Sequence, residues 1–352
     1  MTTQSIAVGD ALGVEQAAPS QRIPAFDFTK GALVLFMVLF HWLNYFYGVY
    51  GEIYTYLRFL TPSFIFITGF LISHVHFAKY GTGSVRLSKR LFVRGLKLVL
   101  LFIALNLLIS PLQHSSFLLD LSSKQVTLTN LYAVFLAGTS GTETPKIASF
   151  TILVPIGYLL MLSSVLSNAC KSFRYVFHVA CILALLGMVV LDFHQMESSN
   201  LELITVGLAG VVLGYCPKRR IEQLVDRSWL LVLAYCAYLA AITMWKVSYY
   251  IQMAGACLTT VLIYTIGVRT AWMTRLHSEI DLLGRYSLFG YIAQIAILQG
   301  LSLVLRRFHG GLLLLAGSFV LGLALTLIAV EAMDRGRSRS KAIDTAYKAV
   351  FA

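Results

Sequence analysis

The sequence predicts an all-α membrane protein that crosses the bilayer about ten times and keeps both termini in the cytoplasm. Of its 352 residues, 58% are hydrophobic and only 12% are charged, whereas about a quarter of the residues in soluble domains are charged. The mean hydropathy of +0.76 agrees with that composition. These values are typical of a polytopic membrane protein and exclude an ordinary soluble domain.

Ten apolar segments are long enough to be considered as spans. A helix needs about 20 mainly apolar residues to cross the hydrocarbon core, and the sixth and seventh segments are the shortest, so the expected range is nine to eleven spans. The predicted spans are 30–48, 59–77, 92–110, 148–167, 175–193, 201–216, 229–245, 249–267, 282–305 and 312–333.

The lysines and arginines predict the orientation of these spans. With the N-terminus inside, 22 of the 28 basic residues fall on the inner side and six on the outer side. Inner loops of membrane proteins are enriched in lysine and arginine, so ten spans place both termini in the cytoplasm. The basic residues that set this orientation also account for the net charge of +12. The positive charge therefore does not indicate a nucleic acid partner.

The parts outside the spans are short. Residues 1–21 form a predicted flexible cytoplasmic tail, residues 22–334 the transmembrane domain, and residues 335–352 a basic cytoplasmic tail. The longest connection, about 111–147, lies outside, and its stretch LTNLYAVFLAG predicts a short interfacial or re-entrant helix. The five cysteines show neither a CxxC pair nor a metal-ligand spacing, so we expect no disulfide framework and no metal site.

The first span, FDFTKGALVLFMVLFHW, carries two ionisable residues on one face. Lys30 and His41 are eleven residues apart, which is about three helical turns plus 20° and roughly 16 Å along the axis. An ionisable side chain inside a span is costly and usually marks a functional pathway, and histidine exchanges protons near neutral pH. The alternatives are a polar contact between helices for His41 and a snorkelling side chain for Lys30.

This segment resembles the opening helix of the integral-membrane acyltransferases, the acyltransferase-3 group and its relatives, which include heparan-α-glucosaminide N-acetyltransferases and glucan-modifying enzymes. The matching residues are Asp27, Lys30, Gly31 and His41. The stretches SFIFITGFLIS, RLSKRLFVRGLKLVLLF and LLGRYSLFGYIAQ resemble later segments of these enzymes and follow in the same order. Gln294 stands where many acyltransferase-3 members have histidine, which favours the wider superfamily and a different acceptor.

The resemblance implies an enzyme that moves an acyl group, with acetyl expected, from cytoplasmic acyl-coenzyme A to a hydroxyl of an extracytoplasmic glycan or other cell-envelope acceptor. Residues 22–334 would be the acyltransferase domain, and acetyl-coenzyme A the donor substrate. Membrane lipid and a glycan or lipid-linked sugar are the implied partners. O-acetylation of a polysaccharide at a bacterial inner membrane would be the setting. The oligomeric state stays open, with a homo-oligomer as one alternative.

The residues have matching candidate roles. His41 would be the general base on the acceptor, or else an acylated nucleophile. Lys30 would lie at the cytoplasmic opening through which the donor enters, and Asp27, one turn away, would pair with it. Coenzyme A carries several phosphates, which a basic cluster at the start of the third span could hold. The cluster consists of Arg86, Lys89, Arg90, Arg94 and Lys97. Positive-inside topology or lipid headgroups would also explain it.

Four further residues are supporting candidates, each with a structural alternative. Asn44 is a candidate acceptor contact or a helix-to-helix hydrogen bond. Arg58 is a candidate for acceptor recognition or a snorkelling side chain. Ser287 and Tyr291, one turn apart, are expected either to line the donor path or to form hydrogen bonds within the core.

A transporter or flippase is the second hypothesis. In it, Lys30 and His41 would line the substrate path. A proton-coupled transporter is expected to hold more acidic residues within its spans than this chain does, so the acyltransferase is favoured.

Overall fold

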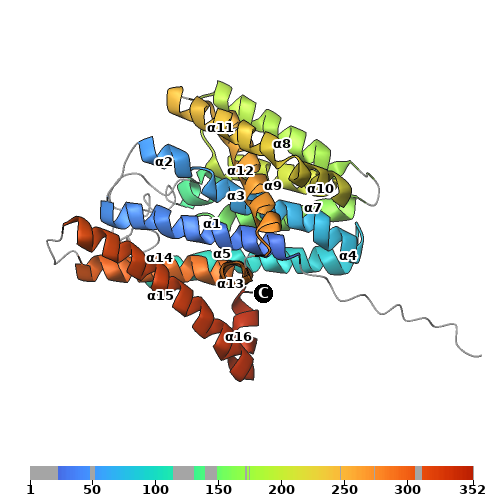
Figure 1. Ribbon diagram of the computed structural model, residues 1–352. Coiled ribbons are helices and arrows are strands. Elements are labelled where there is room, and N and C mark those ends of the chain that lie inside the picture. The colour runs from blue at the N-terminus through green and yellow to red at the C-terminus, as the bar shows by residue number, and fades with distance from the viewer. Residues whose placement is uncertain are drawn as a thin grey trace, which may run out of the picture.

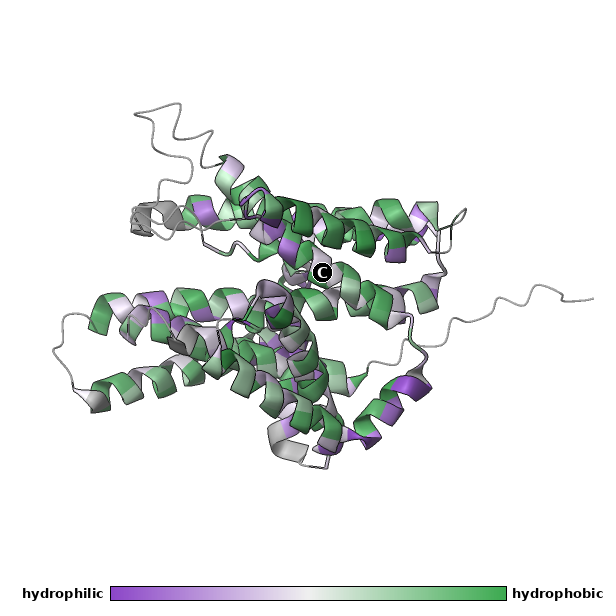
Figure 2. Cartoon of the chain, turned by 90° about the horizontal axis from the view of Figure 1, so that it is seen from above, coloured by the Kyte–Doolittle hydropathy of each residue, from purple (hydrophilic) through white to green (hydrophobic). Residues whose placement is uncertain are grey.

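The computed structural model describes residues 23–47, 52–113, 131–138, 149–170, 173, 175–245, 247–272, 274–305 and 311–351. Every regular element in these ranges is helical, so the prediction of an all-α membrane protein is confirmed for them. The predicted tail 1–21 and most of the long outer connection lie outside the described residues. Figure 1 shows the longer helices running side by side, and apolar residues extend along most of their length (Figure 2).

The helices follow one another with short connections. Single π-helical turns, labelled η, continue the first two long helices. In chain order the elements are α1 (Pro24–Trp42), η1 (Leu43–Tyr47), α2 (Glu52–Leu57), α3 (Leu60–Leu71), η2 (Ile72–Phe77), α4 (Ala78–Tyr80), α5 (Val85–Gln113), η3 (Ala133–Ala137), α7 (Leu153–Ala169), α8 (Val176–Phe193), α9 (Ser199–Gly214), α10 (Lys218–Asp226), α11 (Ser228–Met244), α12 (Tyr249–Arg269), α13 (Thr274–Arg285), α14 (Ser287–Leu305), α15 (Leu312–Arg339) and α16 (Lys341–Phe351).

Local residues explain several helix ends. Pro24 occupies the first turn of α1, where the missing N–H costs nothing. Gly81 follows α4 with φ of +75°, a conformation that glycine adopts without strain. The Ser198 hydroxyl accepts a hydrogen bond from the Leu201 amide, at 3.3 Å, and so caps the start of α9.

The number of spans is smaller than the ten predicted. Among the described residues, seven helices are long and apolar enough to cross a membrane, or eight if α9 and α10, which meet at 103°, form one broken span. The predicted segments 148–167, 201–216 and 229–245 are helical, but α7 and α11 have 17 residues each and α9 has 16. Such helices extend only about 25 Å, short of the roughly 30 Å hydrocarbon core.

Contacts at the two ends of α1 show that it runs antiparallel to α3 and to α15. At the end where α1 begins, the Phe26 ring lies 5.1 Å from that of Phe70, late in α3. At the other end of α1, Trp42 Nε1 donates to Ser318 Oγ, early in α15, at 2.8 Å. Antiparallel packing of this kind is typical of a polytopic membrane protein. The cytoplasmic placement of the termini stays a prediction.

The crossing of α1 and α13 brings two backbones into direct contact. A Cβ on Gly31 would lie 1.9 Å from the Ile280 carbonyl oxygen, and a Cβ on Gly284 would lie 1.7 Å from the Asp27 carbonyl oxygen. Neither position has room for even a methyl group. Small residues allow such close approach between membrane helices, whose association gains little from the hydrophobic effect.

Glycines also allow close approach of the backbones at two other helix pairs. A Cβ on Gly69 of α3 would lie 1.9 Å from the Gly207 carbonyl oxygen of α9. In the pair α5 and α7, Gly95 and Gly157 face one another, and the hydroxyls of Ser88 and Ser164 are 2.8 Å apart. Glycine contacts therefore set the spacing of three helix pairs.

Replacing Gly284 with alanine tests the α1 and α13 crossing. We expect Gly284→Ala to lower the free energy of unfolding by about 1 to 3 kcal/mol, since the added methyl overpacks a closed contact. The midpoint of thermal unfolding in detergent measures the change.

Gly300 is the matched control, because nothing lies within 4 Å of the Cβ it would gain. Gly300→Ala should be neutral or stabilising, as alanine is favoured over glycine in helices. Equal unfolding midpoints for the two variants would contradict the close crossing.

Candidate functional site

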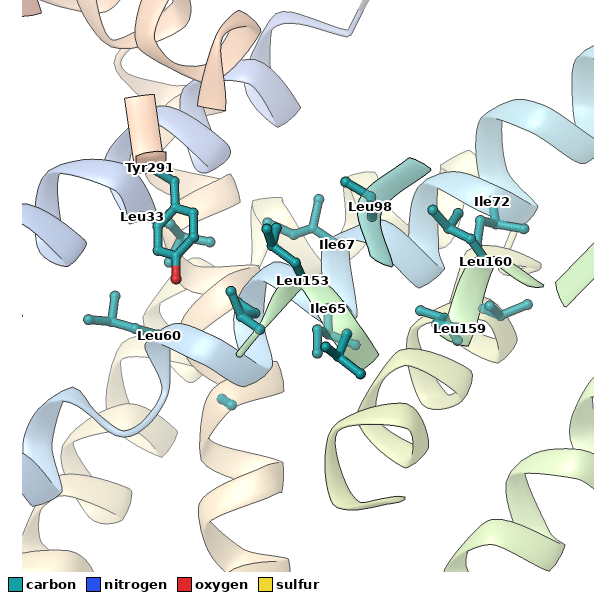
Figure 3. Close-up of a cluster of buried hydrophobic side chains, with 14 of the residues drawn as sticks. Leu33, Leu60, Ile65, Ile67, Ile72, Leu98, Leu153, Leu159, Leu160 and Tyr291 are labelled. Carbon is teal, nitrogen blue, oxygen red and sulfur yellow. The ribbon is translucent and has the colours of Figure 1, made fainter. Parts of the chain in front are cut away.

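A cavity of about 220 Å³ lies between α1, α3, α5, α7 and α14. We call it the basic cavity, for the cations described below. Much of its wall is apolar, and Figure 3 shows part of that wall, with Tyr291 at one side of the cluster. The labelled apolar side chains that line the cavity are Ile67, Ile72, Leu98, Leu153 and Leu160.

Three cations from three different helices line the basic cavity: Lys30 of α1, Arg94 of α5 and Arg285 of α13. No acidic side chain is among the described residues that line it. Lys30 Nζ is 2.6 Å from Asp27 Oδ1, and the two side chains are 23% and 16% exposed. The Asp27 carboxylate thus holds Lys30 in place, while Arg94 and Arg285 supply positive charge that suits an anionic ligand.

Tyr291 connects the basic cavity to His41. Its side chain lines the cavity, the residue is only 8% exposed, and its ring centroid lies 6.1 Å from that of His41. The Phe150 ring packs edge-on against Tyr291 at 5.8 Å, which fixes the plane of the phenol. His41 Nε2 is itself buried. The α-helix continues through both Lys30 and His41, so the two lie on one face of α1 at different depths.

The other predicted residues are divided between this cavity and other places. Ser287 and Arg94 line it, as does Tyr291. The remaining members of the basic cluster, Arg86, Lys89, Arg90 and Lys97, are not on its wall. The Arg90 guanidinium instead donates to the Tyr80 hydroxyl at 2.8 Å.

The two candidates near the other end of the bundle also lie apart from the cavity. Arg58 donates to Gln252 Oε1 at 3.3 Å, which ties the turn after α2 to α12. Asn44 is exposed in η1. The structure therefore brings Lys30, Arg94, Ser287 and Tyr291 together, and it leaves Arg58 and Asn44 elsewhere.

The wall also includes residues that were not singled out as site residues from the sequence, among them Arg285, His76, Tyr347 and Phe351. Arg285 follows Gly284 within LLGRYSLFGYIAQ, one of the segments that carry the resemblance. Its position in that segment was a usable signal. The sequence places His76 at the inner end of the second span, near the expected opening for the donor, but a histidine there is more often solvated, so it was given no role.

The predicted basic tail 335–352 is helical up to Phe351 and contributes to the wall of the basic cavity. α15 continues to Arg339, and α16 then brings Tyr347 and Phe351 to the cavity wall. Arg337 anchors α16, since its guanidinium donates to Asp344 Oδ1 at 2.7 Å and stacks 4.1 Å from the centre of the Tyr347 ring. Hydrogen bonds from Lys348 and Arg337 lower the pKa of Asp344.

A histidine secures α13 beside α1. His277 Nε2 lies 3.0 Å from the Gly267 carbonyl oxygen and must donate to it, because a carbonyl only accepts. His277 Nδ1 lies 3.1 Å from Asp281 Oδ2, and Phe28 of α1 stacks on the imidazole at 4.8 Å. Burial raises the pKa of Asp281, and the neighbouring His277 opposes that shift. The ring thus ties α13 to α12 and to α1.

No protein-family model, curated protein or solved structure matches this chain. The resemblance to integral-membrane acyltransferases therefore rests on the sequence segments given above. In the described residues, no group of three or more histidine, cysteine, aspartate or glutamate side chains is placed to hold a metal ion.

Removing the Asp344 carboxylate tests whether α16 is held by its ion pairs. We expect Asp344→Asn to free α16, so that amide hydrogens of residues 341–351 exchange faster at pH 7. In the unmodified chain the lowered pKa keeps Asp344 charged at pH 5. Protection from exchange should be lost only as the pH falls through that lowered pKa, below the usual value of 3.8.

Arg335→Gln is the control for this experiment. Arg335 pairs with Glu331 on α15 itself and does not touch α16 in any described contact. Its loss should leave the exchange of residues 341–351 unchanged. An effect as large as that of Asp344→Asn would show that general charge, and not the Asp344 contacts, holds α16.

Proposed function

We propose that this chain is a membrane acyltransferase that moves an acyl group from acyl-coenzyme A to a hydroxyl of a cell-envelope acceptor. One observation carries the proposal: a single cavity has three cations on its wall and also has Tyr291, whose ring lies 6.1 Å from that of His41. An anion-binding mouth and a proton-accepting imidazole are the two groups that such a transfer needs.

The residues that line the basic cavity suit the donor in charge and polarity. Guanidinium groups bind phosphates with charge-assisted, often bidentate, hydrogen bonds, so Arg94 and Arg285 would hold the phosphates of coenzyme A with Lys30 beside them. The apolar wall formed by Ile67, Leu98 and their neighbours would accommodate the pantetheine arm. The thioester would then approach Tyr291, at the side of the cavity nearest His41.

The chemistry at His41 would be general base catalysis. The neutral imidazole removes the proton from the acceptor hydroxyl while that oxygen forms a bond to the thioester carbonyl carbon. The carbon to sulfur bond then breaks, and the coenzyme A thiolate takes the proton back from the imidazolium. The products are the acyl ester and free coenzyme A, and the enzyme returns to its starting state.

The acceptor would enter from the opposite end of α1. His41 lies one residue before the end of α1, whereas Lys30 lies near its beginning. With the cytoplasmic orientation predicted from the basic residues, donor and acceptor would come from opposite sides of the membrane. The resemblance makes a glycan or a lipid-linked sugar the expected acceptor, acetyl the expected acyl group and the bacterial inner membrane the expected location.

Binding and turnover of acetyl-coenzyme A test the proposal. Purified wild type should bind coenzyme A and slowly hydrolyse acetyl-coenzyme A. Arg94→Gln should weaken binding about 10- to 100-fold, the effect of losing a hydrogen bond to a charged group. His41→Ala should bind normally but lose about 10²- to 10⁴-fold in turnover, the usual contribution of general base catalysis.

Arg86→Gln is the matched control, because Arg86 is an exposed arginine on the same helix, away from the cavity wall. It should bind coenzyme A like wild type. Equal weakening by Arg86→Gln and Arg94→Gln would contradict a specific site. If wild type binds neither ligand, the donor hypothesis fails, and transport would become the function to assay.

A further inference from the structure

A second and larger cavity, of about 620 Å³, lies on the other side of α1 and α3 from the basic cavity. We call it the aromatic cavity. It is within the range of about 300 to 1,000 Å³ that is usual for ligand pockets. Ile67 lines both cavities and separates them. The proposed acyl transfer makes no use of the aromatic cavity.

The interior of the aromatic cavity is apolar. Phe26 packs against Phe70 and Tyr264, with ring centroids 5.1 and 4.7 Å apart, and these three rings line the cavity together with Phe66 and Leu213. Such a lining suits a hydrocarbon chain, because a chain in this space removes apolar surface from water.

The rim of the aromatic cavity is formed by α10 and carries two arginines. Arg220 and Leu224 are one turn apart on α10, Arg227 directly follows the end of that helix, and all three line the cavity. Asp226 also lines it. Arg269 fixes the end of the helix, since its guanidinium donates to the Val225 carbonyl oxygen at 3.0 Å. The rim therefore presents two arginines and one carboxylate.

The direction of α10 places this rim at a membrane surface. α10 is bent by 103° from α9, so if α9 runs along the membrane normal, α10 lies nearly in the plane of the interface, as amphipathic surface helices do. The bend is at the end of the bundle predicted to be cytoplasmic, where anionic lipids accumulate and where basic pockets between helices bind lipid headgroups.

Arg220 also lines a second depression. This open hollow, of about 440 Å³, lies between α8 and the end of α9, and His178, Cys181 and Tyr215 are among the residues that line it. It shares Arg220, Leu213 and Cys216 with the aromatic cavity. Two apolar spaces that diverge from one guanidinium match a ligand with two hydrocarbon chains and one anionic headgroup.

We infer that the aromatic cavity is a binding site for an anionic diacyl phospholipid. The phosphate lies against Arg220 and Arg227, one acyl chain enters the aromatic cavity, and the second lies in the hollow on α8 and α9. This lipid site is separate from the basic cavity and does not depend on the proposed acyl transfer.

Native mass spectrometry of the full chain in detergent, titrated with defined lipids, tests the inference. Wild type should bind phosphatidylglycerol more tightly than phosphatidylethanolamine or phosphatidylcholine of equal chain length. The double variant with Arg220→Gln and Arg227→Gln should lose that preference, at about fivefold for each arginine. Lysophosphatidylglycerol, with one chain, should bind more weakly than the diacyl lipid.

Two further variants separate the site from general surface effects. Arg219→Gln removes the adjacent exposed arginine, which does not line the cavity, and should leave the preference intact. Val261→Trp fills the cavity from α12 and should reduce phosphatidylglycerol binding while the arginines remain. The inference is overturned if Arg219→Gln weakens binding as much as the double variant, if Val261→Trp binds like wild type, or if the one-chain lipid binds equally well.

Discussion

The whole arrangement depends on the contact between the backbones of α1 and α13. A side chain at Gly31 or Gly284 would collide with a carbonyl oxygen of the opposite helix, so the two helices approach as closely as peptide groups allow. In a membrane, where water does not drive apolar helices together, this kind of packing is a main source of association. His277 reinforces the contact through its hydrogen bond to the end of α12 and its stacking with Phe28.

This crossing explains how the cations come together. It fixes Lys30 of α1 beside Arg285 at the end of α13, and α14 begins two residues later with Ser287 and continues to Tyr291. The glycine contact between α5 and α7 sets the position from which Arg94 reaches the same cavity. Three positive side chains are thereby held together, and Asp27 neutralises one of them.

The sequence was informative about helices and less so about their neighbours. Hydropathy located the long apolar helices of the described residues, but it also counted the 17-residue helices α7 and α11 as full spans, because composition does not show where a helix is cut short. The pairing of Asp27 with Lys30 followed from spacing on one helix. The separation of Arg94 from Arg86 did not, since it depends on what α5 packs against. The place of α16 on the basic cavity likewise depends on Arg337 and Tyr347 meeting across a turn.

The most direct test of the central claim is photoaffinity labelling with a coenzyme A analogue that carries a photoreactive group at the thiol, followed by peptide mapping. We expect labels on the wall of the basic cavity, on residues such as Leu98, Leu153 and Tyr291, and their loss when excess coenzyme A competes. Labels confined to α8 or α11, or labels that excess coenzyme A does not displace, would contradict the assignment of this cavity to an acyl donor.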